Sequence, residues 1–202
     1  MELILVRHGR PETVHGSAGA DPDLTDDGHR QAALLAGFLA GVDPAPDRVI
    51  SSPMRRAEQT ARPLAECAGV ELEVDARLTE FDHGATSYVP VEVSTADKAA
   101  LWAALETGVW GGHRFDPDAF ERRVLHAFDD VIDASPGRRV AVVCHGGVIN
   151  TFLSHLLGRR RSMFVQLDYT SFSRVLASTG GVRQLQSINE TPHLVVPAVR
   201  PA

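Results

Sequence analysis

The sequence predicts an α/β fold, a three-layer sandwich with a mostly parallel central sheet flanked by helices, plus a small helical insertion. Short apolar runs typical of buried strands alternate with longer segments in which apolar residues recur at helical spacing. Two of these runs, ending at Val6 and Cys144, lead directly into polar turns that contain histidine and glycine. The length of 202 residues suits one domain with a modest insertion.

The first half of the chain supplies three predicted strands and two predicted helices. The strands are expected at residues 2–6, 48–51 and 70–74. Thr25 is the predicted N-cap of the first helix, which has two acids in its first turn and apolar residues at positions 32, 35, 36 and 39. Pro53 is expected to open the second helix, which runs to about Cys67.

A looser stretch follows at residues 83–115, with glycines at 108, 111 and 112 and a short predicted helix at 96–105. We interpret this stretch as an insertion over the sheet that acts as a lid. Beyond it, Asp116 and Pro117 begin a helix that ends at the Pro-Gly pair of residues 136–137.

The remaining predicted strands are residues 140–144, 172–177 and 182–188. The helix that follows the first of them runs to Leu157 and is closed by Gly158. Residues 1–194 are therefore expected to form a single domain. The Pro-rich residues 195–202 are expected to form a flexible tail.

Composition excludes several classes of function. The formal net charge is −6 and no run of Lys and Arg builds a basic stripe, so we expect no nucleic-acid partner. Lys98 is the only lysine, and no GxxxxGK motif precedes it, which argues against a P-loop. Cys67 and Cys144 are too few for a disulfide framework. No apolar run reaches the length of a membrane span, so we expect no membrane association and a cytoplasmic location.

Chemistry is expected where polar residues follow the strands. Arg7, His8 and Gly9 follow the first strand, and His145 follows the strand at 140–144. Gly146, directly after His145, opens a helix whose free N–H groups favour an anion. Ligands of parallel sheets bind beyond the carboxyl ends of the strands, where both histidines lie. A single histidine in such a turn is more often structural, so the prediction rests on the combination.

Four segments, in order, carry a family resemblance. They read LVRHG at residues 5–9, LTDDGHRQA at 24–32, SPMRRAEQTA at 52–61 and VVCHGGVI at 142–149. With weaker matches at 78–84 and 189–194, the chain resembles the histidine phosphatase superfamily, the phosphoglycerate-mutase-like proteins, over nearly its whole length. The tripeptide RHG alone is a weak signal, whereas four motifs in family order are a strong one.

The resemblance implies a role for each matched residue. His8 is the nucleophile that takes the phosphoryl group on a ring nitrogen, and Arg7 and Arg56 hold the phosphoryl oxygens. His145 completes the phosphate pocket, and Glu80 matches the residue that protonates the leaving oxygen. These roles agree with the chemistry, because phosphoryl transfer depends on positioning and on cations that stabilise charge on the oxygens.

Some assignments stay open at this point. His8 must be neutral to attack, whereas His145 helps most when charged, so we expect the protein to separate the two pKa values. Asp82 is the alternative to Glu80 as proton donor. Arg10 is an extra cation expected at the mouth of the pocket, where it favours a phosphorylated acid, although a solvated loop arginine fits equally well.

The expected activity is hydrolysis of a small phosphate monoester without metal or other cofactor. The alternatives are a phosphoglycerate-mutase-type phosphotransferase and an inactive member that binds a phosphorylated ligand. The mutase is less favoured because residues 10–12 read Arg-Pro-Glu, which departs from the mutase pattern. Residues 85–87 read Ala-Thr-Ser, without the Trp-Glu-Gly common in phosphatases, and this leaves the substrate open.

Two other enzyme classes fit less well. A metal hydrolase lacks support because no HxH or HExxH spacing occurs. A cysteine phosphatase built on Cys144 would need an arginine at position 150, which is Asn150. The partner is expected to be a small phosphorylated metabolite, and the sequence leaves open whether the protein is a monomer or a homodimer.

Overall fold

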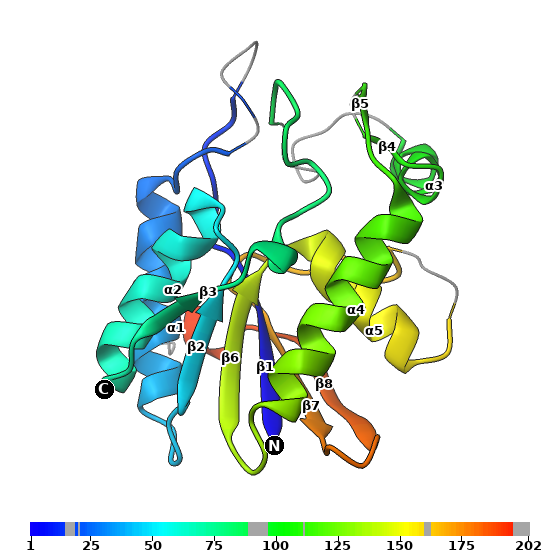
Figure 1. Cartoon of the computed structure of the whole chain (residues 1–202). Helices are drawn as coiled ribbons and strands as arrows, with labels where there is room; N and C mark the ends of the chain where they lie inside the picture. The colour runs from blue at the N-terminus through cyan, green and yellow to red at the C-terminus, as the bar shows by residue number, and fades with distance from the viewer. Residues whose placement is uncertain (15–18, 20, 89–96, 111, 160–162, 196–202) are drawn as a thin grey trace.

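The computed structural model describes residues 1–14, 19, 21–88, 97–110, 112–159 and 163–195 (Figure 1). Its main sheet has six strands in the order β3-β2-β6-β1-β7-β8. The strands are β1 (Glu2–Arg7), β2 (Arg48–Ser51), β3 (Leu72–Val74), β6 (Arg139–Cys144), β7 (Phe172–Ala177) and β8 (Arg183–Glu190). β3, β2, β6 and β1 pair in parallel, whereas β7 is antiparallel to both of its neighbours. The prediction of a mostly parallel sheet is confirmed.

Helices cover both faces of this sheet (Figure 1). They are α1 (Asp26–Ala40), α2 (Arg55–Ala68), α4 (Pro117–Asp133) and α5 (Gly146–Leu156). Alternation along β1 and β6 separates the two layers, because successive strand side chains point to opposite faces. Leu3 and Leu5 join one core cluster with α4 and α5, and Ile4 and Val6 join the other with α1 and α2. The predicted three-layer α/β arrangement is confirmed.

Helix starts follow the predicted capping residues in two cases. The Thr25 hydroxyl accepts a hydrogen bond from the Gly28 N–H at 3.0 Å, and the Asp116 carboxylate caps α4. The prediction that Pro53 opens α2 is wrong, because Met54 is still extended and the helix begins at Arg55. A carboxylate distant in sequence, that of Asp21, accepts from the Arg55 N–H at 2.9 Å, which local spacing does not reveal.

Strand and helix ends shift by one or two residues elsewhere. β3 begins at Leu72 instead of residue 70, because Val70 donates to the Ala65 carbonyl and belongs to the end of α2, where Gly69 is left-handed. β6 begins at Arg139, β8 covers Arg183–Glu190, and α5 ends at Leu156. The structure also contains two 3₁₀ turns, η1 (Ala76–Leu78) and η3 (Pro192–Leu194).

The stretch predicted as an insertion contains α3 (Lys98–Glu106) and a two-stranded sheet of β4 (Val109–Trp110) and β5 (His113–Arg114). The short helix was expected, and its predicted first residue, 96, lies outside the described residues. The hairpin was not predicted, since two-residue strands carry no periodicity. Figure 1 places these elements beyond one end of the main sheet, above α4.

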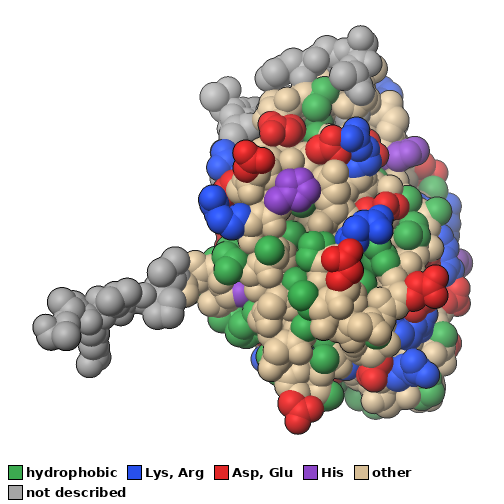
Figure 2. All heavy atoms as spheres, turned by 90° about the vertical axis from the view of Figure 1, so that its left-hand side faces the viewer, with side chains coloured by type: hydrophobic (Ala, Val, Ile, Leu, Met, Phe, Trp, Pro, Cys, Tyr) green, Lys and Arg blue, Asp and Glu red, His purple; other side chains and the backbone are tan. Residues whose placement is uncertain are grey.

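The surface formed by α1 and α2 carries both signs of charge in close mixture (Figure 2). Ion pairs such as Arg55 with Asp23 and Arg30 with Asp27 belong to this mixture. This face therefore presents no continuous basic stripe. Among the described helices, none is both long and apolar enough to cross a membrane. The expected flexible tail lies outside the described residues from position 196 onward.

Candidate active site

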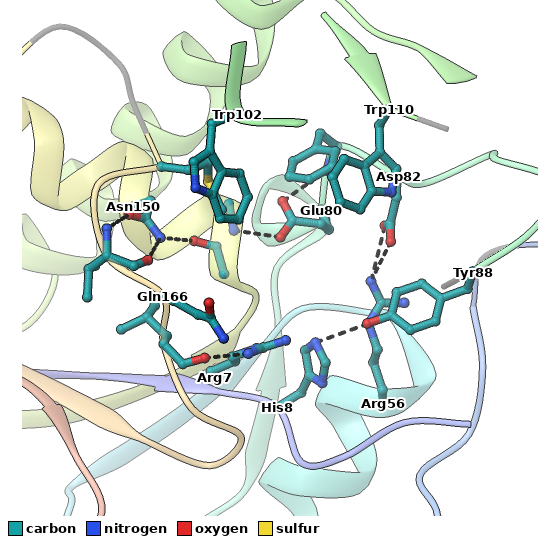
Figure 3. A pocket seen from close by; sticks show the side chains of 16 residues that line it. Arg7, His8, Arg56, Glu80, Asp82, Tyr88, Trp102, Trp110, Asn150 and Gln166 are labelled. Atoms are coloured by element: carbon teal, nitrogen blue, oxygen red, sulfur yellow. Dashed lines mark hydrogen bonds and ion pairs between the residues drawn. The ribbon is translucent and has the colours of Figure 1, made fainter. Parts of the chain in front are cut away.

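A pocket of about 570 Å³ opens beyond the carboxyl end of the sheet, between the strand ends and α3 (Figure 3). One side, here called the arginine end, consists of Arg7, His8 and Arg56. The opposite side, the tryptophan end, consists of Trp102 and Trp110, and Glu80 lies between the two ends. The other lining residues are Phe81, Asp82, Tyr88, Gly146, Gly147, Asn150, Met163, Val165, Gln166 and Leu167.

His8 follows β1 and is held in one orientation. Its Nδ1 lies 2.8 Å from the carbonyl oxygen of Gly9, which accepts the Nδ1–H of the neutral ring. Nε2 then carries a lone pair, and the Nε–H of Arg56 donates to it at 3.3 Å. Burial and the positive charges of Arg56 and Arg7 lower the pKa of His8 well below its ordinary value. The ring is therefore neutral, with an unprotonated Nε2.

The turn that carries His8 is fixed from behind. The N–H of Gly9 donates to the Thr60 hydroxyl at 2.9 Å, and that hydroxyl donates to the Arg56 carbonyl at 2.7 Å. Thr60 thus ties the end of β1 to the first turn of α2. His8 and Arg56, which are 48 residues apart in the sequence, hold their relative positions through this bridge.

Both arginines are buried and oriented by partners. Arg7 donates to the Leu167 carbonyl and stacks its guanidinium 4.2 Å from the centre of the Tyr169 ring. Arg56 is only 1% exposed and donates to both carboxylate oxygens of Asp82 at 3.1 Å. Tyr88 covers its guanidinium at 4.7 Å. Guanidinium groups held in this way form a preorganised cationic site.

Glu80 is buried between the two ends of the pocket. Its carboxylate accepts hydrogen bonds from the N–H groups of Gly147 at 2.7 Å and Phe81 at 3.0 Å. Burial, together with the nearby charge of Asp82, raises the pKa of Glu80 to about 7. Both protonation states are therefore accessible near neutral pH, as a group that gives and takes a proton requires.

The approach of Glu80 to α5 depends on the absence of a side chain at Gly147. A Cβ there would lie 2.3 Å from Glu80 Oε1 and 2.5 Å from the Phe81 ring. The neighbouring Gly146 lines the pocket as expected, at the first residue of α5. The free N–H groups of this helix start and the helix dipole favour negative charge here.

His145 lies behind the pocket, with its ring centre 5.2 Å from that of His8. Its Nε2 is 2.8 Å from the Ser52 hydroxyl, and Nδ1 is buried without a hydrogen-bond partner among the described residues. Burial and the positive charges of Arg56 and Arg7 lower the pKa of His145 well below its ordinary value. Burial beside arginines thus lowers the pKa of both histidines, and the expected separation of the two values stays a prediction.

Arg10 does not belong to this pocket. Its side chain is about half exposed and lies 3.8 Å from Asp27. Its backbone is engaged as well, since its carbonyl accepts from Thr25 at the start of α1. The prediction of a cation at the mouth is therefore corrected, because the turn after Gly9 directs Arg10 toward α1.

The alternative donor, Asp82, is buried and lines the same pocket. Burial raises its pKa, while the charge of Arg56 and the hydrogen bonds from it oppose that rise. Its oxygens are engaged by a guanidinium, whereas the partners of the Glu80 oxygens among the described residues are backbone N–H groups. The geometry gives Asp82 the position of an anchor for Arg56.

Several residues around the pocket were not predicted. Ser52 binds His145, Tyr169 stacks on Arg7, and Tyr88 covers Arg56. Ser52 stands inside a quoted motif, so its position beside the arginines was an available signal. Trp102 and Trp110 are the only two tryptophans of the chain, and no motif indicated that both would line one pocket.

Within the part of the chain that the structure describes, no group of three or more His, Cys, Asp and Glu side chains is arranged to hold a metal ion. On another side of the site, Nε2 of His193 is 3.0 Å from the Thr170 hydroxyl. Thr170 in turn donates its N–H to the His8 carbonyl at 3.3 Å.

Comparisons with known proteins identify relatives of this chain. The probable phosphoglycerate mutase GpmB of Yersinia enterocolitica is 31% identical over 221 residues, covering 98% of this chain and 97% of that protein. A phosphoserine phosphatase of Entamoeba histolytica, solved with 3-phosphoglyceric acid, is 26% identical with a TM-score of 0.73, covering 96% and 99% of the two chains.

A mycobacterial glucosyl-3-phosphoglycerate phosphatase, solved with VO3, is 25% identical with a TM-score of 0.73, covering 94% of this chain and 99% of that one. The family model of the histidine phosphatase superfamily, branch 1, matches residues 3–191. The order of the motifs, the fold and these relatives lead to the same conclusion: the chain belongs to the histidine phosphatase superfamily.

Proposed function

We propose that the protein hydrolyses a small phosphate monoester through a phosphohistidine intermediate at His8, without a metal or other cofactor. The observation that carries this proposal is the unprotonated Nε2 of His8, which faces the same pocket as two buried arginines and a carboxyl group with a pKa near 7. Nucleophile, oxyanion-binding cations and proton donor are thus present together.

In the first step, Nε2 of His8 attacks phosphorus, and the bond between phosphorus and the ester oxygen breaks. The protonated carboxyl of Glu80 gives its proton to the leaving oxygen, so that an alcohol departs. The site then holds a phosphohistidine and the Glu80 carboxylate. Arg7 and Arg56 bind the non-bridging oxygens, to which a guanidinium can donate two parallel, charge-assisted hydrogen bonds.

In the second step, a water molecule gives a proton to the Glu80 carboxylate and its oxygen attacks phosphorus. The bond between phosphorus and Nε2 breaks, and the electron pair returns to the ring. Inorganic phosphate leaves, and Glu80 is protonated again. A group with a pKa of about 7 serves both steps.

His145 takes part as a hydrogen-bond donor. The Ser52 hydroxyl accepts from the Met54 N–H at 3.3 Å and can donate its own proton to Nε2 of His145. The Nδ1–H of the neutral ring then remains available for a phosphoryl oxygen. A bound phosphate dianion would also raise the pKa of His145, because opposite charge favours the protonated ring.

A mutase-type phosphotransferase is the second candidate, favoured by the names of relatives such as GpmB. Both activities share the first step and differ in the group that accepts the phosphoryl from His8. For a phosphatase the acceptor is water, and for a mutase it is the hydroxyl of a bound acid.

We further propose that residues 83–115 act as a lid on a single domain of residues 1–194.

The test is a hydrolysis screen over phosphorylated metabolites and synthetic alkyl phosphates, with mutase activity measured on 3-phosphoglycerate in parallel. We expect phosphate release that continues in EDTA, since arginines supply the positive charge. Orthovanadate should inhibit competitively because it adopts the five-coordinate geometry of the transferring group. Inactivation by EDTA that zinc or magnesium reverses would contradict the proposal, and so would interconversion of phosphoglycerates without phosphate release.

A further inference from the structure

We infer that the tryptophan end binds the alcohol part of the substrate, and that this part is uncharged, apolar and ring-containing. The inference rests on the proposed function, and it names the substrate class of the same site. With the phosphoryl group at the arginine end, the leaving group extends past Glu80 and meets Trp102 and Trp110 (Figure 3). The alcohol therefore contacts indole rings.

The wall behind Trp110 is a packed aromatic cluster. Phe81 lies edge-on to Trp110 with ring centres 5.6 Å apart and stacks on Phe115 at 5.2 Å, and Phe120 packs against both phenylalanines at 6.0 Å. Phe81 also donates its N–H to Glu80, so the wall and the proposed acid are adjacent along the chain. Aromatic rings in such a wall favour offset or edge-on contact with another ring.

The charges beyond the arginine end disfavour a substrate carboxylate. Among the described residues that line the pocket, the cations are Arg7 and Arg56, and both belong to the arginine end. Arg56 is further committed to Asp82 at 3.1 Å. Beyond the arginine end, the titratable groups among these described lining residues are the carboxyls of Glu80 and Asp82, and neither can attract a substrate carboxylate.

A polar side chain on the wall is also engaged elsewhere. The Asn150 amide donates to the carbonyls of Gly146 at 2.9 Å and Val165 at 3.0 Å, and its oxygen accepts from the Val165 N–H at 3.1 Å. Asn150 thus uses both of its amide hydrogens to hold the neighbouring loop. It presents no free N–H group to a hydroxylated or carboxylated substrate.

Apolar space continues beside the pocket, along the phenylalanine wall. A second cavity shares Phe81, Gly147 and Met163 with the pocket. Its other lining residues are Leu105, Glu106, Phe115, Phe120 and Thr151. An apolar group that passes Met163 would remain in contact with hydrocarbon, which favours a bulky alcohol over a short polar one.

Hydrolysis of three alkyl phosphates tests the inference: 2-phenylethyl phosphate, ethyl phosphate and 3-phosphoglycerate. We expect kcat/KM for 2-phenylethyl phosphate to exceed that for ethyl phosphate by about tenfold or more, the effect of burying one ring. 3-Phosphoglycerate should be the poorest substrate. 3-Phosphoglycerate also tests whether arginines 160 and 161, which lie outside the described residues, bind a substrate carboxylate.

Variants assign the preference to the indoles. Trp102→Ala and Trp110→Ala should each lower the ratio of kcat/KM between 2-phenylethyl and ethyl phosphate by about fivefold to tenfold, mainly through KM. Trp110→Phe should recover most of that ratio. Leu34→Ala, on the exposed side of α1, is the matched control and should leave activity and ratio unchanged.

A binding measurement separates the two proposals. Because both tryptophans of the chain line the pocket, intrinsic fluorescence should report ligand binding directly. Phenylphosphonate should bind with a Kd about tenfold lower than that of methylphosphonate. Equal Kd values, or preferred hydrolysis of 3-phosphoglycerate, would overturn the inference and leave the proposed phosphatase intact. No hydrolysis of any ester, with phenylphosphonate still preferred, would overturn the proposed function and support the apolar subsite.

Discussion

At the scale of single residues, the buried carboxyls of Glu80 and Asp82 take different roles because their hydrogen-bond partners differ. The described residues that donate to Glu80 do so through backbone N–H groups, and burial dominates and raises its pKa to about 7. Asp82 faces Arg56 with both oxygens and serves to hold that guanidinium. Separate environments for paired carboxyls are a common way to assign acid and anchor roles.

The role proposed for Glu80 predicts a dependence on the leaving group. Glu80→Gln should slow alkyl phosphates by about two to four powers of ten and aryl phosphates such as nitrophenyl phosphate far less, because nitrophenolate departs without a proton. For alkyl esters, kcat/KM of the wild type should also fall as pH rises through about 7, where Glu80 loses its proton, and Gln should abolish that limb. Steady-state kinetics at several pH values measures both effects.

Asp82→Asn provides the comparison for this test. It should weaken binding and lower kcat for alkyl and aryl esters by similar factors, since it loosens Arg56 and leaves the proton donor in place. If Asp82→Asn shows the leaving-group dependence and Glu80→Gln does not, the two roles are reversed.

The ionised carboxylate of Glu80 should lower the free energy of unfolding above neutral pH. Its folded pKa of about 7 lies above the ordinary value of 4.5, so the folded state binds the extra proton between these values. The resulting stabilisation is present at low pH and lost as pH rises through 7. Between pH 5 and 8, the wild type should lose about 2 to 3 kcal/mol of unfolding free energy relative to Glu80→Gln. Urea titrations at both pH values measure it, and an unchanged difference would contradict the buried carboxyl.

The sequence predicted residues near strand ends better than residues placed by loops. Arg7 is the last residue of β1 and His8 follows it directly, so their convergence with His145 after β6 follows from parallel pairing of the two strands. The direction of Arg10 depends on how Gly9 meets Gly28 at the start of α1, where a Cβ on Gly9 would lie 2.8 Å from the Gly28 carbonyl oxygen. Such a contact between distant backbones leaves no local pattern.

At the scale of elements, α5 links the anion site to the proposed acid. Its first turn contributes Gly146 to the pocket, and the N–H of its second residue holds Glu80. The helix is apolar on nearly all sides because it lies between the sheet and α4, and Phe152 packs on Phe128 with ring centres 4.3 Å apart. A buried helix of this kind gives a rigid position to whatever its N-terminus binds.

Gly147→Ala tests this link. The added methyl would meet Glu80 Oε1 and the Phe81 ring at 2.3 to 2.6 Å, so the carboxyl must move and its hydrogen bond must lengthen. We expect alkyl phosphate hydrolysis to fall by about tenfold or more, with a smaller loss for nitrophenyl phosphate, and a loss of about 1–3 kcal/mol of stability.

The matched control is Gly37→Ala in α1, where a Cβ meets no atom within 4 Å. It should keep full activity and raise stability by about 0.5–1 kcal/mol, because alanine is the better helix former. If Gly147→Ala behaved like Gly37→Ala in kinetics and in unfolding, the close packing of α5 against Glu80 would be refuted.

Elements with strong periodicity or capping residues could be predicted, and short connecting elements could not. α1 and α4 begin where Thr25 and Asp116 place them. The start of α2 depends on Asp21, and the β4–β5 hairpin has two residues in each strand, so neither is encoded in a local repeat. Trp110 belongs to that hairpin, and no motif indicated that Trp102 of α3 would line the same pocket, which is why the tryptophan end required the structure.

At the scale of the whole molecule, the sheet topology gathers two cations at one site in a chain whose net charge is negative. The chain carries a formal net charge of −6, yet the pocket places Arg7 and Arg56 around His8 where β1 and α2 meet. Local focusing of positive potential in a low-dielectric pocket overcomes weak long-range repulsion of an anionic substrate. Raising the ionic strength should therefore change the on-rate of the substrate by a small factor. Truncation of Arg7 or Arg56 should lower turnover by a larger factor.

The most direct test of the central claim is to trap the covalent intermediate and to measure its stability in acid and in alkali. The enzyme is mixed with a phosphate-labelled ester, quenched within one turnover and digested, and the peptides are analysed by mass spectrometry. The account predicts a phosphoryl group on the peptide that contains His8, stable in alkali and labile in acid, and neither label nor turnover in His8→Ala. Turnover of the wild type with no label on that peptide, or full activity of His8→Ala, would contradict it.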